Sequence, residues 1–159
     1  MQYGKKTVKI YIQLTKLQAK EEFPMIHLIM GLKGSGKTKK MIDSIHQSVT
    51  SASGDVVCIE YGKKLTYDVN YRVRLVDSKE YGISNPCMLK GLLSGLHAGN
   101  YDITNVYIDN LYKTIGDDRA NGEAFVLWCA KFAETNNMNI TITISDDAAL
   151  ASDEIKKFL

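Results

Sequence analysis

Short apolar segments alternate along this chain with segments in which apolar residues recur every three or four positions. The short apolar runs occupy residues 25–30, 55–60, 103–109 and 138–145. Runs of this length are typical of strands buried on both faces of a parallel sheet. The helical spacing covers residues 37–50, 86–98, 120–135 and 146–159. Strands that alternate with helices predict an α/β fold, a three-layer sandwich with a mainly parallel sheet and helices on both sides.

Two further segments leave alternatives open. Residues 71–77 alternate apolar and polar positions, which fits either an edge strand or one half of a hairpin. Residues 8–14 alternate in the same way, but lysines surround them and no partner strand is evident. We therefore treat residues 1–24 as an N-terminal extension, which is either an ordered strand or a loose or artefactual tail preceding a natural start at Met25. Residues 25–159 are expected to form one domain.

Composition narrows the class of protein. The 159 residues are 45% hydrophobic and 24% charged, with a formal net charge of +2. This near-neutral balance gives no support for nucleic-acid binding, which favours a strongly basic face. No apolar run is long enough to span a membrane. The cysteines, Cys58, Cys87 and Cys129, are far apart in apolar segments and lack zinc-site spacing, so we expect buried thiols and a cytoplasmic location.

A glycine-rich loop follows the first apolar run, and residues 31–38 read GLKGSGKT. Gly31, Gly36, Lys37 and Thr38 match every specified position of the G-x-x-x-x-G-K-[ST] phosphate-binding loop. Glycine lets backbone N–H groups turn inward around an anion, and the helix that follows points its N-terminus at the same phosphates. We expect nucleotide contacts from Gly31, Leu32, Lys33, Gly34, Ser35, Gly36, Lys37, Thr38 and Lys39. The motif predicts that the domain binds a nucleoside triphosphate.

The same motif predicts a magnesium site. Lys37 is expected to reach the β- and γ-phosphates and to assist catalysis, while the Thr38 hydroxyl binds Mg²⁺. A phosphate loop needs a second carboxylate at the end of another strand to help hold the metal ion. Asp109 ends the apolar run at 103–109 and is the best candidate for this role.

Hydrolysis requires a further group that orients or activates the attacking water. Many ATPases carry a glutamate directly after the strand-end aspartate, but that position holds Asn110 here. Glu60, which ends the run DVVCIE, is the alternative catalytic residue. The competing interpretation is that Glu60 only ends its strand or pairs with Lys63 or Lys64.

Two more residues are candidates with open alternatives. Ser145, at the end of ITITIS, either touches the γ-phosphate or, like Asp146, caps the last helix. Arg119 either reaches the site of a neighbouring subunit as an arginine finger or is a solvated surface residue.

In their order along the chain, residues 31–38, Glu60, Asp109 and Ser145 resemble the RecA-like group of P-loop ATPases. The resemblance covers about residues 25–159. It implies a parallel sheet with the loop strand in the middle, and a glutamate ending the second strand, where Glu60 falls. The chain also resembles short uncharacterised bacterial ATP-binding proteins that are often labelled twitching-motility ATPases (PilT-like). The acidic and histidine boxes and the hexamer-completing arginines of the longer motor ATPases are not visible in this sequence.

The function expected from the sequence is ATP binding with slow, Mg²⁺-dependent hydrolysis that requires self-association or an unidentified protein partner. ATP is preferred to GTP because the guanine-reading N-K-x-D string is absent. Two alternatives remain: a small nucleotide or nucleoside kinase, although the chain is poor in arginine, and a non-catalytic nucleotide switch, which Asn110 favours.

Overall fold

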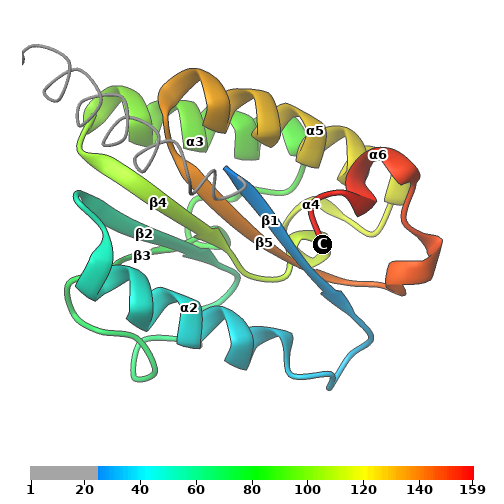
Figure 1. Ribbon diagram of the computed structural model, residues 1–159, viewed down its shortest axis with the longest axis horizontal. Coiled ribbons are helices and arrows are strands. Elements are labelled where there is room, and N and C mark those ends of the chain that lie inside the picture. The colour runs from blue at the N-terminus through cyan, green and yellow to red at the C-terminus, as the bar shows by residue number, and fades with distance from the viewer. Residues whose placement is uncertain (1–24) are drawn as a thin grey trace, which may run out of the picture.

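Five parallel strands form the centre of the protein in the computed structural model, which describes residues 25–159 (Figure 1). The strands are β1 (Ile26–Gly31), β2 (Asp55–Glu60), β3 (Arg74–Asp77), β4 (Ile103–Ile108) and β5 (Asn139–Ser145). They lie in the order β1-β5-β4-β2-β3, and every pairing between neighbouring strands is parallel. The predicted α/β fold with a mainly parallel sheet is therefore confirmed. The expectations for residues 1–24 lie outside the described residues.

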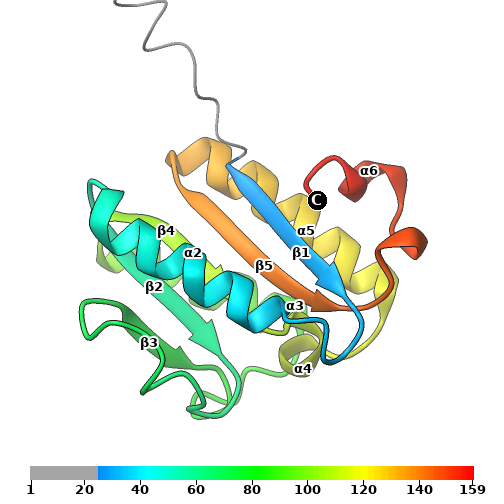
Figure 2. The ribbon, with the colours of Figure 1, turned by 60° about the horizontal axis from the view of Figure 1, so that its bottom comes forward.

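Helices cover both faces of this sheet. They are α2 (Lys37–Ser51), α3 (Pro86–Gly99), α4 (Leu111–Ile115), α5 (Arg119–Asn136), the 3₁₀ turn η1 (Ala148–Leu150) and α6 (Asp153–Lys156). Helix α2 lies on one face, and α3 and α5 lie on the other (Figures 1 and 2). Because parallel strands all point the same way, the segments that follow β1, β2, β4 and β5 emerge at the same end of the sheet, where the carboxyl ends of the strands lie.

Strands β2 and β4 are largely apolar because each of them faces two hydrophobic cores. In β4, Val106 and Ile108 point into the core shared with α3 and α5, while Tyr107 points into the core shared with α2. Met41 and Ile45 of α2 are fully buried in this second core. The continuous apolar runs thus reflect burial on both faces, as the sequence predicts.

Strand β3 settles the alternative left open for residues 71–77. It pairs in parallel with β2 and ends the described sheet, so the edge-strand interpretation is confirmed and the hairpin is wrong. A parallel neighbour needs a long connection, and residues 61–73 provide it. Leu65 and Val73 of this connection are buried in the α2 core, which fixes the connection against the sheet.

Three other expectations need correction. The single helix expected at 146–159 is instead the turn η1 followed by the short α6, because the Asp147 side chain accepts from Ala149 N and starts a separate turn. Helix α4 follows β4 and was not predicted. Cys87 is exposed near the start of α3, whereas Cys58 and Cys129 are buried as expected.

Strand β1 lies at an edge of the sheet formed by residues 25–159. The resemblance implies a loop strand in the middle, and for the described sheet this expectation is wrong. On the side away from β5, Leu28 N donates to Phe158 O at 2.8 Å, so the C-terminal residues cover part of this edge. None of the helices in the described part of the chain combines the length and the apolarity that a membrane crossing requires.

Candidate functional site

The phosphate loop connects the end of β1 to the start of α2. Gly34 and Gly36 have φ values of 82° and 84°, a left-handed conformation that side-chain-bearing residues rarely adopt. Ser35 N donates to Leu32 O at 3.1 Å and closes the turn between them. A Cβ on Gly31 would lie 2.5 Å from Ser35 Oγ, so this position also needs glycine unless Ser35 moves. The glycines of the motif are therefore required by the shape of the loop.

Lys37 is the first residue of α2 and lies folded across the loop. Its side chain is buried, and Nζ donates to Leu32 O at 2.9 Å. The same carbonyl oxygen accepts from Ser35 N, so Leu32 contributes through its backbone while its side chain is 65% exposed. Of the other predicted contact residues, Lys33, Ser35, Thr38 and Lys39 are exposed along the loop and the first turn of α2.

Thr38 and Asp109, which are distant in the sequence, meet at the carboxyl ends of the strands. Thr38 Oγ1 donates to Asp109 Oδ1 at 3.2 Å, and Thr143 Oγ1 donates to the same oxygen at 3.0 Å. Within the described residues no group of three or more His, Cys, Asp or Glu side chains could hold a metal ion by itself. A hydroxyl and one carboxylate nevertheless fit Mg²⁺, which takes few protein ligands and completes its shell with phosphate oxygens and water.

Glu60 lies beside Asp109 on the neighbouring strand, where Asp109 N donates to Ile59 O at 2.9 Å. The Glu60 side chain is only 2% exposed. Its Oε2 accepts from Lys64 N at 2.6 Å and from Leu65 N at 2.9 Å. One carboxylate oxygen of Glu60 is thus bound to the backbone that follows β2, a contact that neither sequence interpretation anticipated.

The thiol of Cys58, in β2, is buried, and its pKa is raised well above its ordinary value, first by burial and then by the negative charges of these two acids. Cys58 therefore remains a protonated, unreactive thiol at neutral pH.

Asn110, which stands where many ATPases have glutamate, has a φ of 54°. Asparagine tolerates this left-handed conformation better than most side-chain-bearing residues, so the local backbone explains its presence. Asn110 N donates to Thr143 Oγ1 at 2.7 Å. Thr143 thus joins Asp109 and Asn110, a role that the sequence analysis missed. The only signal was its place two residues before the end of β5.

Ser145 ends β5 directly beside the phosphate loop, since its register partner in β1 is Gly31. It is half-buried. The cap of the turn that follows is Asp147, so the alternative in which Ser145 or Asp146 provides the cap is wrong.

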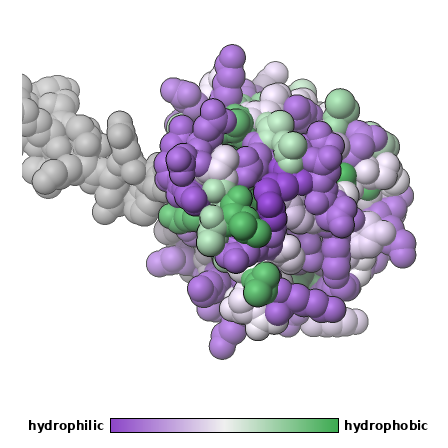
Figure 3. Space-filling view, turned by 90° about the vertical axis from the view of Figure 1, so that its right-hand side faces the viewer, coloured by the Kyte–Doolittle hydropathy of each residue, from purple (hydrophilic) through white to green (hydrophobic). Residues whose placement is uncertain are grey.

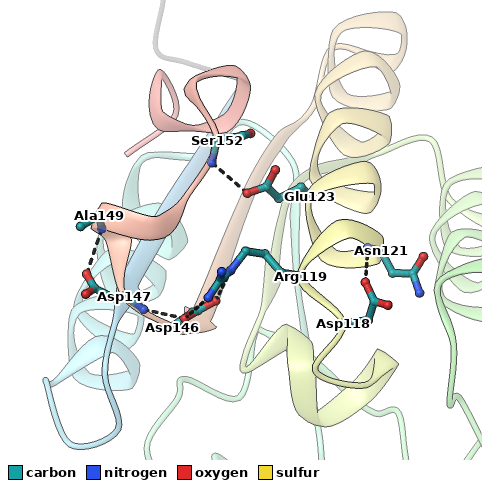
Figure 4. Close-up of polar contacts among 8 residues, drawn as sticks. All are labelled: Asp118, Arg119, Asn121, Glu123, Asp146, Asp147, Ala149 and Ser152. Atoms are coloured by element: carbon teal, nitrogen blue, oxygen red, sulfur yellow. Dashed lines mark hydrogen bonds and ion pairs between the residues drawn. The ribbon is translucent and has the colours of Figure 1, made fainter.

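Arg119, at the start of α5, and Asp146, directly after β5, form an ion pair (Figure 4). Arg119 Nε donates to Asp146 Oδ2 at 2.9 Å, and its terminal nitrogen donates to Oδ1 at 3.1 Å. Nearby, Glu123 Oε1 accepts from Ser152 N at 2.9 Å and ties α5 to the C-terminal segment. Arg119 is exposed, as the solvated-surface interpretation expects, and it is also bound to Asp146 of its own chain, which neither interpretation anticipated.

This ion pair predicts a pH-dependent contribution to stability. The Arg119 guanidinium lowers the pKa of Asp146 below its ordinary value of 3.8. A lowered carboxylate pKa stabilises the folded state above the ordinary value, and this stabilisation disappears as the pH falls through the lowered pKa. We expect Arg119→Gln to reduce the urea midpoint at pH 7 and to match the wild type at strongly acidic pH. Arg74→Gln, on the exposed edge strand, is the control, and a midpoint difference that does not depend on pH would contradict the prediction.

The end of the molecule that carries the loop and the C-terminal segment is mostly hydrophilic, with separate hydrophobic spots (Figure 3). Leu32 and Leu150, which belong to these two segments, are more than half exposed. The hydrophilic character suits a charged ligand better than an apolar one.

Comparison of the chain with protein-family models and with curated proteins found no match. The site must therefore be interpreted from its own geometry.

Proposed function

We propose that this chain is a P-loop nucleotide-binding protein of RecA-like type that binds ATP with Mg²⁺ and hydrolyses it slowly. The observation that carries the proposal is the contact between Thr38 Oγ1 and Asp109 Oδ1, at 3.2 Å. It joins the phosphate-binding motif to a strand-end carboxylate, the two parts that a Mg²⁺–triphosphate site requires.

In the proposed complex, the backbone N–H groups of residues 32–38 and the N-terminus of α2 hold the phosphates. Lys37 leaves Leu32 O and donates to the β- and γ-phosphates. Thr38 and Asp109 hold Mg²⁺, which supplies positive charge against the phosphate oxygens when it is bound. Thr143 donates to the Asp109 carboxylate and fixes its orientation.

For hydrolysis we propose that Glu60 orients the attacking water. The position of Glu60 beside Asp109 supports this role. Its hydrogen bonds to Lys64 N and Leu65 N instead favour a second candidate function, a nucleotide switch in which Glu60 holds the connection 61–73 and no hydrolysis occurs.

The binding proposal is tested by titrating the protein with a fluorescent ATP analogue with and without Mg²⁺. We expect Mg²⁺ to tighten binding by about tenfold in the wild type and to have little effect in Thr38→Val and Asp109→Asn. The control is Asp102→Asn, because Asp102 is exposed and directly precedes β4, at the amino ends of the strands. This variant should keep the Mg²⁺ effect. Absence of nucleotide binding, or the same Mg²⁺ effect in all four proteins, would overturn the proposal.

Single-turnover hydrolysis then separates the ATPase from the switch. Turnover that is lost in Glu60→Gln while ATP still binds supports the ATPase, and bound ATP that persists unhydrolysed supports the switch. Turnover per molecule that rises with protein concentration would support self-association as a requirement for hydrolysis.

A further inference from the structure

A hollow of about 470 Å³ opens at the end of the sheet opposite the candidate site. It is lined by the first residues of three neighbouring strands, Asp55 of β2, Arg74 of β3 and Ile103 of β4. In a parallel sheet the amino ends of the strands lie together, as their carboxyl ends do. The proposed nucleotide site, at the carboxyl ends, therefore leaves this hollow without a role.

Two of the three arginines in the chain, Arg72 and Arg74, line this hollow. No ion pair within residues 25–159 involves either of them. The Asp55 carboxylate, which also lines the hollow, instead accepts from Asn100 Nδ2 at 2.8 Å. A guanidinium group binds a carboxylate through two parallel hydrogen bonds. The hollow thus presents two guanidinium groups to an acidic ligand.

Strand β3 ends the sheet of residues 25–159, and its outer side has no strand beside it there (Figure 2). Directly after β3, Ser78 N donates to Glu60 O at 2.8 Å. Because backbone groups alternate in direction along a strand, those of Arg74 and Val76 also face β2, and those of Leu75 face away from the sheet. Outward N–H and C=O groups on an edge strand are the groups with which an added strand pairs.

Helix α3 lines the hollow through two glycines, Gly95 and Gly99. A Cβ on either glycine would have no heavy atom within 4 Å. Glycine lowers the stability of a helix interior, and it also allows another main chain to approach closely. The side of the hollow that α3 provides therefore has room for a further chain segment.

We propose that the hollow and the outer side of β3 bind an extended, acidic segment of a partner protein, which pairs with β3 and places carboxylates on Arg72 and Arg74. In an added strand every second side chain lies on the same face of the sheet, which matches the two-residue spacing of the arginines. Tyr71, next to Arg72 in the chain, is 94% exposed, and tyrosine and arginine are enriched among the residues that dominate protein interfaces. A net charge of only +2 favours a protein segment over nucleic acid. This inference does not depend on the proposed nucleotide binding.

The test measures, by fluorescence anisotropy, how a labelled peptide of alternating glutamate and valine binds to the 159-residue chain. We expect about tenfold weaker binding to Arg72→Gln and to Arg74→Gln than to the wild type. Lys131→Gln, which removes an exposed cation from α5, is the control and should bind as the wild type does. The same peptide with glutamine in place of glutamate should bind at least tenfold more weakly. A wild type that does not bind the acidic peptide, or an equal loss in all three variants, would overturn the proposal.

A matched pair of variants tests the hollow itself. Gly95→Leu places a side chain in the hollow and should abolish peptide binding. Gly91→Leu, one turn earlier on α3 and outside the lining, should leave binding unchanged. A Cβ on either glycine meets no neighbour, so we expect both variants to retain the fold, which circular dichroism verifies. Equal peptide affinities of the two variants would show that the peptide does not use the hollow.

Hydrogen exchange followed by NMR tests the pairing with β3. The Leu75 amide should exchange more slowly when the peptide is bound, and an unchanged exchange rate would contradict strand pairing. Two other ligands test the choice of occupant. Tighter binding of a labelled oligothymidine would assign the arginines to nucleic acid, and binding of citrate with the affinity of the peptide would assign them to a small anion. Either result would overturn the proposal.

Discussion

Lys37→Ala is expected to weaken Mg²⁺–ATP binding by about 100-fold or more while the fold is retained. Lys37 would donate charge-assisted hydrogen bonds to two phosphates, each worth about 1.5–3 kcal/mol, and every 1.4 kcal/mol is about tenfold in affinity. In the absence of ligand the lysine bonds to Leu32 O, so alanine removes one neutral acceptor contact at a cost to stability of about 1 kcal/mol. Titration with a fluorescent ATP analogue and urea denaturation measure the two effects.

The control for this prediction is Lys40→Ala, which removes the same charge from an exposed position on α2. If Lys40→Ala weakened ATP binding as much as Lys37→Ala, the effect would come from overall charge and the assigned contact of Lys37 would be wrong.

Glu60→Ala is expected to lower the free energy of unfolding by about 2–4 kcal/mol. The substitution leaves the N–H groups of Lys64 and Leu65 without their acceptor, and each buried unpaired donor costs about 1–3 kcal/mol. Glu60→Gln should lose less, because the amide oxygen can accept the same two hydrogen bonds. Urea denaturation followed by circular dichroism gives the free energies.

Glu80→Ala provides the control for Glu60, since Glu80 is an exposed acid whose pairing with Lys63 is a surface contact. A Glu60→Ala variant as stable as the wild type would show that the carboxylate does not anchor the connection 61–73. That result would favour the proposed ATPase role of Glu60 over the nucleotide-switch function.

The sequence predicted the parts of the molecule that depend on neighbouring residues. The glycines, Lys37 and Thr38 are contiguous, and their chemistry requires one loop shape. Asp109 could be named as a candidate because an acid directly after an apolar strand must lie at the carboxyl ends of the strands. The alternation of strands and helices was sufficient for the parallel α/β fold, since the inner strands β2, β4 and β5 are mostly buried on both faces.

The remaining parts depend on contacts between distant segments. The acceptors and donors that define the role of Glu60 are backbone groups of residues 64 and 65, which have no side-chain signature. Thr143 resembles any other β-branched strand residue until its hydroxyl is seen at Asp109. The prediction of a single final helix was wrong, because apolar spacing over 146–159 does not reveal that Asp147 begins a separate turn.

The position of β1 at an edge of the described sheet has a consequence for the order of folding. Its only sheet neighbour among residues 25–159 is β5, the last strand of the described residues, and on its other side Leu28 N donates a hydrogen bond to Phe158 O. Contacts across such long chain separations form late, because the intervening chain must first be ordered. The strand that precedes the glycine-rich loop therefore reaches its place only after the segments between it and β5 have been ordered. The candidate site formed by residues 31–38 and Asp109 is consequently complete only after β5 and the residues up to Phe158 have been placed, so its assembly is a late event in folding.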